Sequence, residues 1–150
     1  MTLQDFSHHL RGLEARIRQL LERDLPDKAG NLALSRFKEN FQNEGFFGRK
    51  WKEVKRRLNP KTKGAARTSK ILTGQTGDLG RSLQMTPQPG KATITSDLPY
   101  SAAHNEGTST AGRGRHTRIP KRQFMGEHPK LTKEIEELIK REIDKAINKN

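Results

Sequence analysis

The sequence has no cysteine, one tryptophan, one tyrosine and six phenylalanines among its 150 residues. The absence of cysteine excludes disulfide bonds, thiol catalysis and zinc sites built on thiolates. Leucine, isoleucine, valine and phenylalanine together make up only one fifth of the chain, which is near the limit at which a chain folds alone. We therefore expect a single domain over residues 1–150, with a thin core that neighbouring subunits or a partner help to complete.

Long apolar runs are also missing. No segment approaches the roughly 20 apolar residues that a membrane-spanning helix needs. The first ten residues include Asp5, His8 and His9, where a signal peptide would be apolar. We expect a soluble protein that is made in the cytoplasm and has no membrane partner.

Positive charge, in contrast, is abundant and clustered. The chain has 30 Lys and Arg against 17 Asp and Glu, a net charge of +13; residues 49–70 hold ten basic residues and one acidic residue, and residues 113–122 hold five basic residues. Such clusters attract phosphate backbones or an acidic protein face, unless they are simply solvated loops. The candidate basic contact surface consists of Lys55, Arg56, Arg57, Lys61, Lys63, Arg113, Arg115 and Arg118.

Apolar periodicity predicts helices at both ends of the chain. Large apolar residues recur every three or four positions over residues 3–24, which indicates an amphipathic helix. Leu25-Pro26-Asp27 is expected to interrupt it before a second helix that ends near residues 43–45. A longer stripe from Leu131 to Ile147, with Glu early and Lys late, predicts a C-terminal amphipathic helix.

The middle of the chain has strand and loop signals. Residues 83–96 alternate apolar and polar around a Pro- and Gly-rich turn, which is typical of a β-hairpin. Residues 100–107 indicate a short helix or turn, whereas residues 49–70, apart from a short helix near Trp51, and residues 108–118 indicate flexible basic loops. The predicted fold is α+β, with N-terminal helices, a small antiparallel sheet and a long C-terminal helix.

Motifs that suggest catalysis or metal binding are incomplete. His104-Asn105-Glu106 has the spacing of the zinc deaminases, but those sites need cysteines that this chain lacks. The segment 74–77 has the form G-x-x-G, yet no Walker lysine follows, so we interpret it as a tight turn that starts a helix. We predict no catalytic residue, metal site, cofactor or small-molecule substrate, and hence a protein that is not an enzyme.

Three segments in order resemble the phage virion morphogenesis (tail completion) family. They are Ile71–Leu83 (ILTGQTGDLGRSL), Asp97–Gly107 (DLPYSAAHNEG) and Ile119–Gly126 (IPKRQFMG). The resemblance extends over about residues 70–147. Gln123 stands where the family usually has proline, and Gly80 replaces a bulkier residue.

This resemblance implies a structural protein of the virion, assembled in the host cytoplasm, that completes the tail and joins it to the head. It implies several copies in a ring, partners among the tail and head-connector proteins, and no cofactor. The alternative from a different class is a basic protein that binds nucleic acid non-specifically through its two basic segments.

Within these segments we single out Tyr100, Arg122 and Phe124 as candidate interface residues. Tyr100 combines an apolar ring with a polar tip, and Phe124 stands among polar and small residues, so each suits either a subunit contact or the edge of the core. Arg122 suits either an ion pair with an acid of a neighbouring subunit or a position that faces water.

Overall fold

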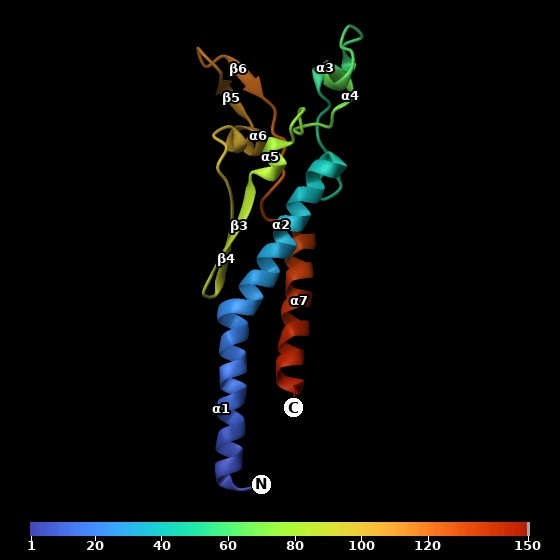
Figure 1. Cartoon of the computed structure of the whole chain (residues 1–150). Helices are drawn as coiled ribbons and strands as arrows, with labels where there is room; N and C mark the ends of the chain where they lie inside the picture. Colours follow the sequence, from blue (N-terminus) through green and yellow to red (C-terminus); the bar gives the residue numbers. More distant parts are fainter. Residues whose placement is uncertain (150) are drawn as a thin grey trace. The chain divides into compact units, whose positions relative to one another are not determined.

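Residues 1–149 are described by a computed structural model with helices at both ends of the chain and small two-stranded sheets between them (Figure 1). This confirms the predicted α+β class. In chain order the elements are α1 (Leu3–Gln19), the π-helix η1 (Leu20–Asp24), α2 (Leu25–Asn43), β1 (Gly45–Phe46), β2 (Arg49–Lys50), α3 (Lys55–Leu58), α4 (Ala65–Thr68), α5 (Asp78–Arg81), β3 (Leu83–Gln88), β4 (Lys91–Ser96), α6 (Ser101–Glu106), β5 (Thr108–Ala111), β6 (Thr117–Ile119) and α7 (Pro129–Asn148). None of the helices formed by residues 1–149 is long and apolar enough to cross a lipid bilayer.

The predicted interruption at Pro26 is wrong, because the helical run continues through it by way of η1. Proline has no N–H to donate to the carbonyl four residues earlier, and its ring crowds that carbonyl. A π-turn widens the helix at this point: the Leu25 N–H bonds to the Leu20 carbonyl, five residues back. The Glu22 carbonyl instead accepts a hydrogen bond from the Gly90 N–H at 3.2 Å. The proline therefore produces a π-helical turn in place of a loop.

The chain forms two compact units. Unit one consists of Met1–Ala33, Met85–Ile94 and Pro129–Asn150, and unit two consists of Leu34–Gln84 and Thr95–His128. In unit one, α7 packs against α1 and η1, with Leu20, Leu131 and Leu138 buried. Gly30 has no room for a side chain, because an added Cβ would lie 2.8 Å from the side chains of Met85 and Ala92.

Unit two has an aromatic core. The Phe41 ring lies 5.8 Å from the ring of Trp51 and 5.0 Å from that of Phe124, centroid to centroid. Buried aliphatic side chains complete this core: Ile71, Leu79 and Leu83. The predicted turn at residues 74–77 is confirmed, since Gly77 adopts a left-handed conformation directly before α5.

The strands are short and paired two by two. β1 pairs with β2 and β5 with β6, both antiparallel, and β3 pairs with β4 in the predicted hairpin. Residues 108–118, expected as a loop, therefore contain β5 and the first residues of β6. Residues 49–70, expected as a loop apart from a short helix near Trp51, contain β2, α3 and α4, and α3 begins at Lys55, after Trp51. The flexibility of both ranges stays a prediction.

Candidate interaction surfaces

The three candidate interface residues differ sharply in exposure. Tyr100 is 43% exposed, whereas Arg122 is 7% and Phe124 is 0% exposed. Phe124 packs against the Phe41 ring, so its position corresponds to the core-packing alternative. Tyr100 alone of the three has a large part of its side chain exposed, and its role as an interface residue stays a prediction.

Polar side chains fix the backbone around Phe124. Asn40 Nδ2 donates to the Phe124 carbonyl at 2.9 Å, and Asn105 Oδ1 accepts from the N–H groups of Phe124 and Met125 at 2.9 and 3.1 Å. The indole N–H of Trp51 donates to the Gln123 carbonyl at 2.7 Å. The segment 119–126 is thus held in unit two by buried amides as well as by apolar packing.

Arg122 is buried and therefore does not face water, whereas its expected ion pair with an acid of a neighbouring subunit stays a prediction. Its Nε donates to the Lys52 carbonyl at 3.0 Å, Nη2 reaches the Glu53 carbonyl at 3.5 Å, and its own N–H donates to the His104 carbonyl at 2.9 Å. Burial, followed by the charge of Arg122, lowers the pKa of His104, which favours a neutral imidazole at pH 7. Arg122 therefore joins residues 52–53 to the end of α6.

Serine hydroxyls link two of the three segments that carry the family resemblance. Ser82 Oγ donates to the Leu79 carbonyl at 2.7 Å and lies 2.7 Å from Ser96 Oγ, which in turn bonds to Ser101 Oγ. The Leu98 N–H also donates to Ser96 Oγ at 3.3 Å. The motif residues around positions 82 and 101 thus serve the fold of unit two.

Two members of the predicted basic surface have structural contacts. Arg57 makes a two-pronged ion pair with Glu44, with Nη1 to Oε2 at 3.1 Å, and the Ile71 N–H donates to the same carboxylate at 2.7 Å. Arg56 donates to the carbonyls of Ala66 and Ser69 at 2.6 and 2.7 Å. These bonds tie α3 to residues 66–71 and to the end of α2.

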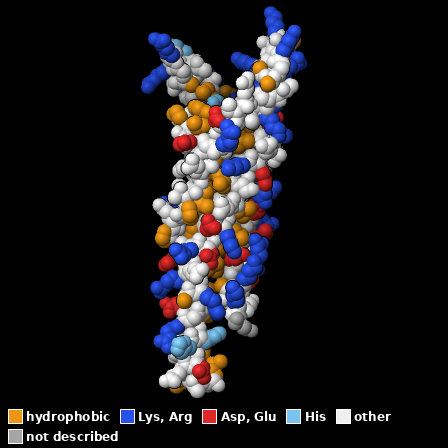
Figure 2. Space-filling view, viewed as in Figure 1, with side chains coloured by type: hydrophobic (Ala, Val, Ile, Leu, Met, Phe, Trp, Pro, Cys, Tyr) orange, Lys and Arg blue, Asp and Glu red, His pale blue; other side chains and the backbone are white. Residues whose placement is uncertain are grey.

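The remaining six predicted basic residues are exposed: Lys55, Lys61, Lys63, Arg113, Arg115 and Arg118. Figure 2 shows Lys and Arg side chains gathered at the β5–β6 hairpin and at the α3–α4 segment. Unit two carries 18 Lys and Arg against 7 Asp and Glu, a net charge of +11, whereas unit one carries 12 against 10, a net of +2. Nearly all the excess positive charge therefore belongs to unit two.

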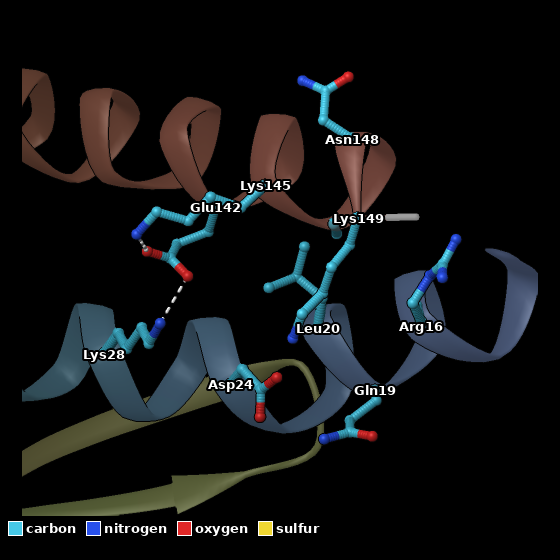
Figure 3. Close-up of a pocket in the computed structure, with 10 residues that line it drawn as sticks. Arg16, Gln19, Leu20, Asp24, Lys28, Glu142, Lys145, Asn148 and Lys149 are labelled. Atoms are coloured by element: carbon cyan, nitrogen blue, oxygen red, sulfur yellow. Dashed lines mark hydrogen bonds and ion pairs between the residues drawn. The ribbon is translucent and has the colours of Figure 1, made fainter.

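Unit one has an ion-pair cluster that sequence reasoning missed. Glu142 of α7 is buried and accepts from Lys28 of α2 at 2.5 Å and from Lys145 at 3.1 Å (Figure 3). The hydrogen bond from Lys28, followed by that from Lys145, holds the pKa of Glu142 below its usual value. Only the i, i+3 spacing of Glu142 and Lys145 is visible in the sequence, because Lys28 is distant along the chain.

His104 belongs to the incomplete zinc-deaminase pattern, for which we predict no metal site. Its Nδ1 is buried and has no hydrogen-bond partner among residues 1–149. Within residues 1–149, no three His, Asp or Glu side chains are grouped closely enough to hold a metal ion.

Comparison with known proteins identifies the family to which the chain belongs. No curated protein and no solved structure matches the chain. A family model described as the phage virion morphogenesis family matches residues 4–144, which include α1 and most of α7 as well as the three motif segments. The match thus extends over the first 70 residues, where the motifs alone carry little information. The chain belongs to the phage virion morphogenesis family.

Proposed function

We propose that this protein completes the phage tail and joins it to the head, acting as a ring of identical copies at the head–tail junction. The observation that carries the proposal is the family match over residues 4–144, which gives the chain a structural role in phage assembly, among other phage proteins. We propose tail proteins and head-connector proteins as its direct partners.

The uneven charge of the two units supports two kinds of contact. Unit two, at +11, suits an acidic protein face or the phosphates of DNA that passes through the junction. Unit one, at +2, suits contacts between copies, because like-charged surfaces would repel one another. Tyr100 is the exposed candidate contact of unit two, while Arg122 and Phe124 position the segment 119–126.

The test is a phage lysate from which this gene has been deleted. We expect electron microscopy to show full heads and separate tails, which join when the purified protein is added. A basic protein of similar size and charge is the control and should not restore joining. Normal virions in the deleted lysate would refute the proposal.

Non-specific nucleic-acid binding is the second candidate, favoured by the charge of unit two. Because Arg56 and Arg57 hold the fold, the variant to test replaces exposed lysines by glutamine: Lys55, Lys61 and Lys63. The matched control makes the same charge change on exposed lysines of unit one: Lys91, Lys133 and Lys140.

If this candidate is right, the unit-two variant binds DNA more weakly than the control variant. The slope of log K against log salt then also falls by about 0.9 for each phosphate that the variant no longer neutralises. Equal weakening in both variants would mean that net charge alone attracts the DNA, and would count against a binding surface on unit two.

A further inference from the structure

The first three turns of α1 form an exposed arm. Every residue from 1 to 12 is exposed, and the large apolar side chains of Leu3, Phe6 and Leu10 are 87%, 48% and 47% exposed. In Figure 1 these turns (blue) continue past the last turn of α7, the helix that packs against the rest of α1. No element that residues 1–149 form in unit one covers the apolar face of this arm.

The sequence nevertheless specifies where the arm begins. Thr2 Oγ1 accepts from the Asp5 N–H at 3.1 Å, and the Asp5 carboxylate accepts from the Thr2 N–H at 2.8 Å, which is a complete capping box. An isolated helix of this length is marginal in water, and exposed Leu and Phe side chains add no stability to it. A defined helix start with an uncovered apolar face indicates that the arm packs against a partner.

Unit one also has an apolar groove of about 370 Å³. Its walls come from η1, α2, the β3–β4 hairpin and α7, and its residues include Leu21, Leu25, Ala29, Ile94, Ile135 and Ile139. One charged side chain, Lys91, lies among the lining residues. Since an apolar cavity of about 150 Å³ accommodates benzene, this groove has room for an aromatic ring and a neighbouring aliphatic side chain.

We propose that the arm of one copy docks in this groove of the next copy, with Phe6 and Leu10 as its anchors. The inference rests on the proposed ring and names the contact that closes it. Arm and groove are different surfaces of one chain, so the contact is head-to-tail, as a ring requires, whereas pairing of two arms would stop at a dimer.

Charge favours a second copy of this chain as the occupant. Residues 3–24 carry four Arg against four Asp and Glu, a net charge of zero in a chain of +13. Contact through the arm and the groove therefore brings near-neutral surfaces of unit one together and uses none of the basic residues of unit two.

The size of the contact predicts its strength. Residues 3–13 span about 16 Å at 1.5 Å per residue, so one arm buries less than a standard interface of about 800 Å² on each partner. A single contact is accordingly weak in dilute solution, and closing the ring on a tail strengthens it through multiple simultaneous contacts. Because the interface is apolar and neutral, added salt does not weaken it.

Cysteine cross-linking tests the inference cleanly, since the natural chain has no cysteine. We would place one cysteine on the arm, Leu10→Cys, and one in the groove, Ala29→Cys or Ile139→Cys on its two helical walls, and treat the full-length protein with a short bis-maleimide. Gly12→Cys is the matched arm control: Gly12 lies about 200° around the helix from Leu10, and a Cβ added there meets nothing within 4 Å.

We expect Leu10→Cys combined with either groove cysteine to give a ladder of dimers, trimers and higher species that persists at high salt. The single variants and the Gly12→Cys combinations should remain monomeric. Dimers from Leu10→Cys alone would replace the inference with arm–arm pairing, and the absence of a ladder with both groove positions would overturn it.

The outcome can be separated from that of the proposed function. Restored head–tail joining by the unmodified protein, together with no ladder, would reject only the arm contact. A ladder combined with normal virions in the deleted lysate would reject only the role in tail completion.

Discussion

Asn105→Ala tests how firmly the segment 119–126 is held. Asn105 is buried, and its Oδ1 accepts from the N–H groups of Phe124 and Met125 at 2.9 and 3.1 Å. Alanine leaves both donors without an acceptor, and each unsatisfied buried donor costs about 1–3 kcal/mol. Since Met125 is only half-buried, we expect water to accept a hydrogen bond from its N–H in part of the molecules. The free energy of unfolding should then fall by about 2–4 kcal/mol.

Urea unfolding followed by Trp51 fluorescence is the assay. Trp51 is the only tryptophan, and its indole N–H donates to the Gln123 carbonyl at 2.7 Å, so its emission reports on the segment that Asn105 holds. With a urea dependence of about 2 kcal/mol per molar, the middle of the usual range, the midpoint should fall by about 1–2 M.

The matched control is Asn59→Ala. Asn59 Oδ1 also accepts from a backbone N–H, that of Lys61 at 3.0 Å, but in an exposed turn where water can replace it. We expect a loss of stability below about 0.5 kcal/mol. If the midpoint of Asn105→Ala equalled that of Asn59→Ala, the reasoning about buried donors would be refuted.

Two further predictions concern the loss of stability in acid and the space for a side chain at a glycine. Glu44→Gln should lower the free energy of unfolding by about 1–2 kcal/mol at pH 7, because glutamine cannot keep the charge-assisted bonds to Arg57. Those bonds, followed by the Ile71 N–H, lower the pKa of Glu44 below 4.5 in the folded state, so its stabilisation is present above that pH and is lost as the pH falls through the folded value. Urea midpoints measured against pH should therefore decline less on the acid side for the variant, and equal declines would contradict this. Gly107→Ala should cost about 1–3 kcal/mol more than Gly48→Ala. Both residues have positive φ, but an added Cβ at Gly107 would lie 2.8 Å from the Lys121 nitrogen, while at Gly48 it meets nothing within 4 Å. Thermal unfolding should show the difference, and equal melting temperatures would count against it.

Local patterns predicted the elements that depend on local signals. The α7 stripe, the β3–β4 hairpin and the turn at Gly77 form as expected, because periodicity and turn residues determine them. The effect of Pro26 was not predictable, since the free Glu22 carbonyl finds its donor in Gly90, far along the chain. β5 and β6 have no apolar alternation, so nothing in residues 108–118 indicates their pairing.

The candidate surfaces were predicted less well than the fold. Composition located the basic segments, but it did not separate Arg56 and Arg57, which bind carbonyls and Glu44, from the exposed lysines beside them. Arg122 was unpredictable because its acceptors are backbone carbonyls that have no sequence signature. The amphipathic period of residues 3–24 likewise predicts an apolar face, but it does not indicate which surface covers that face.

The serine chain of unit two has a direction. A hydroxyl donates one proton, and Ser82 donates its proton to the Leu79 carbonyl, so Ser82 accepts from Ser96 and Ser96 in turn accepts from Ser101. The three hydroxyl groups therefore donate in one direction, from Ser101 to Ser96 to Ser82, and each hydrogen bond polarises the next. None of these serine hydroxyls ionises in the pH range in which unit two is folded. The hydrogen bonds between α5 and α6 therefore keep the same donor-to-acceptor direction throughout that range.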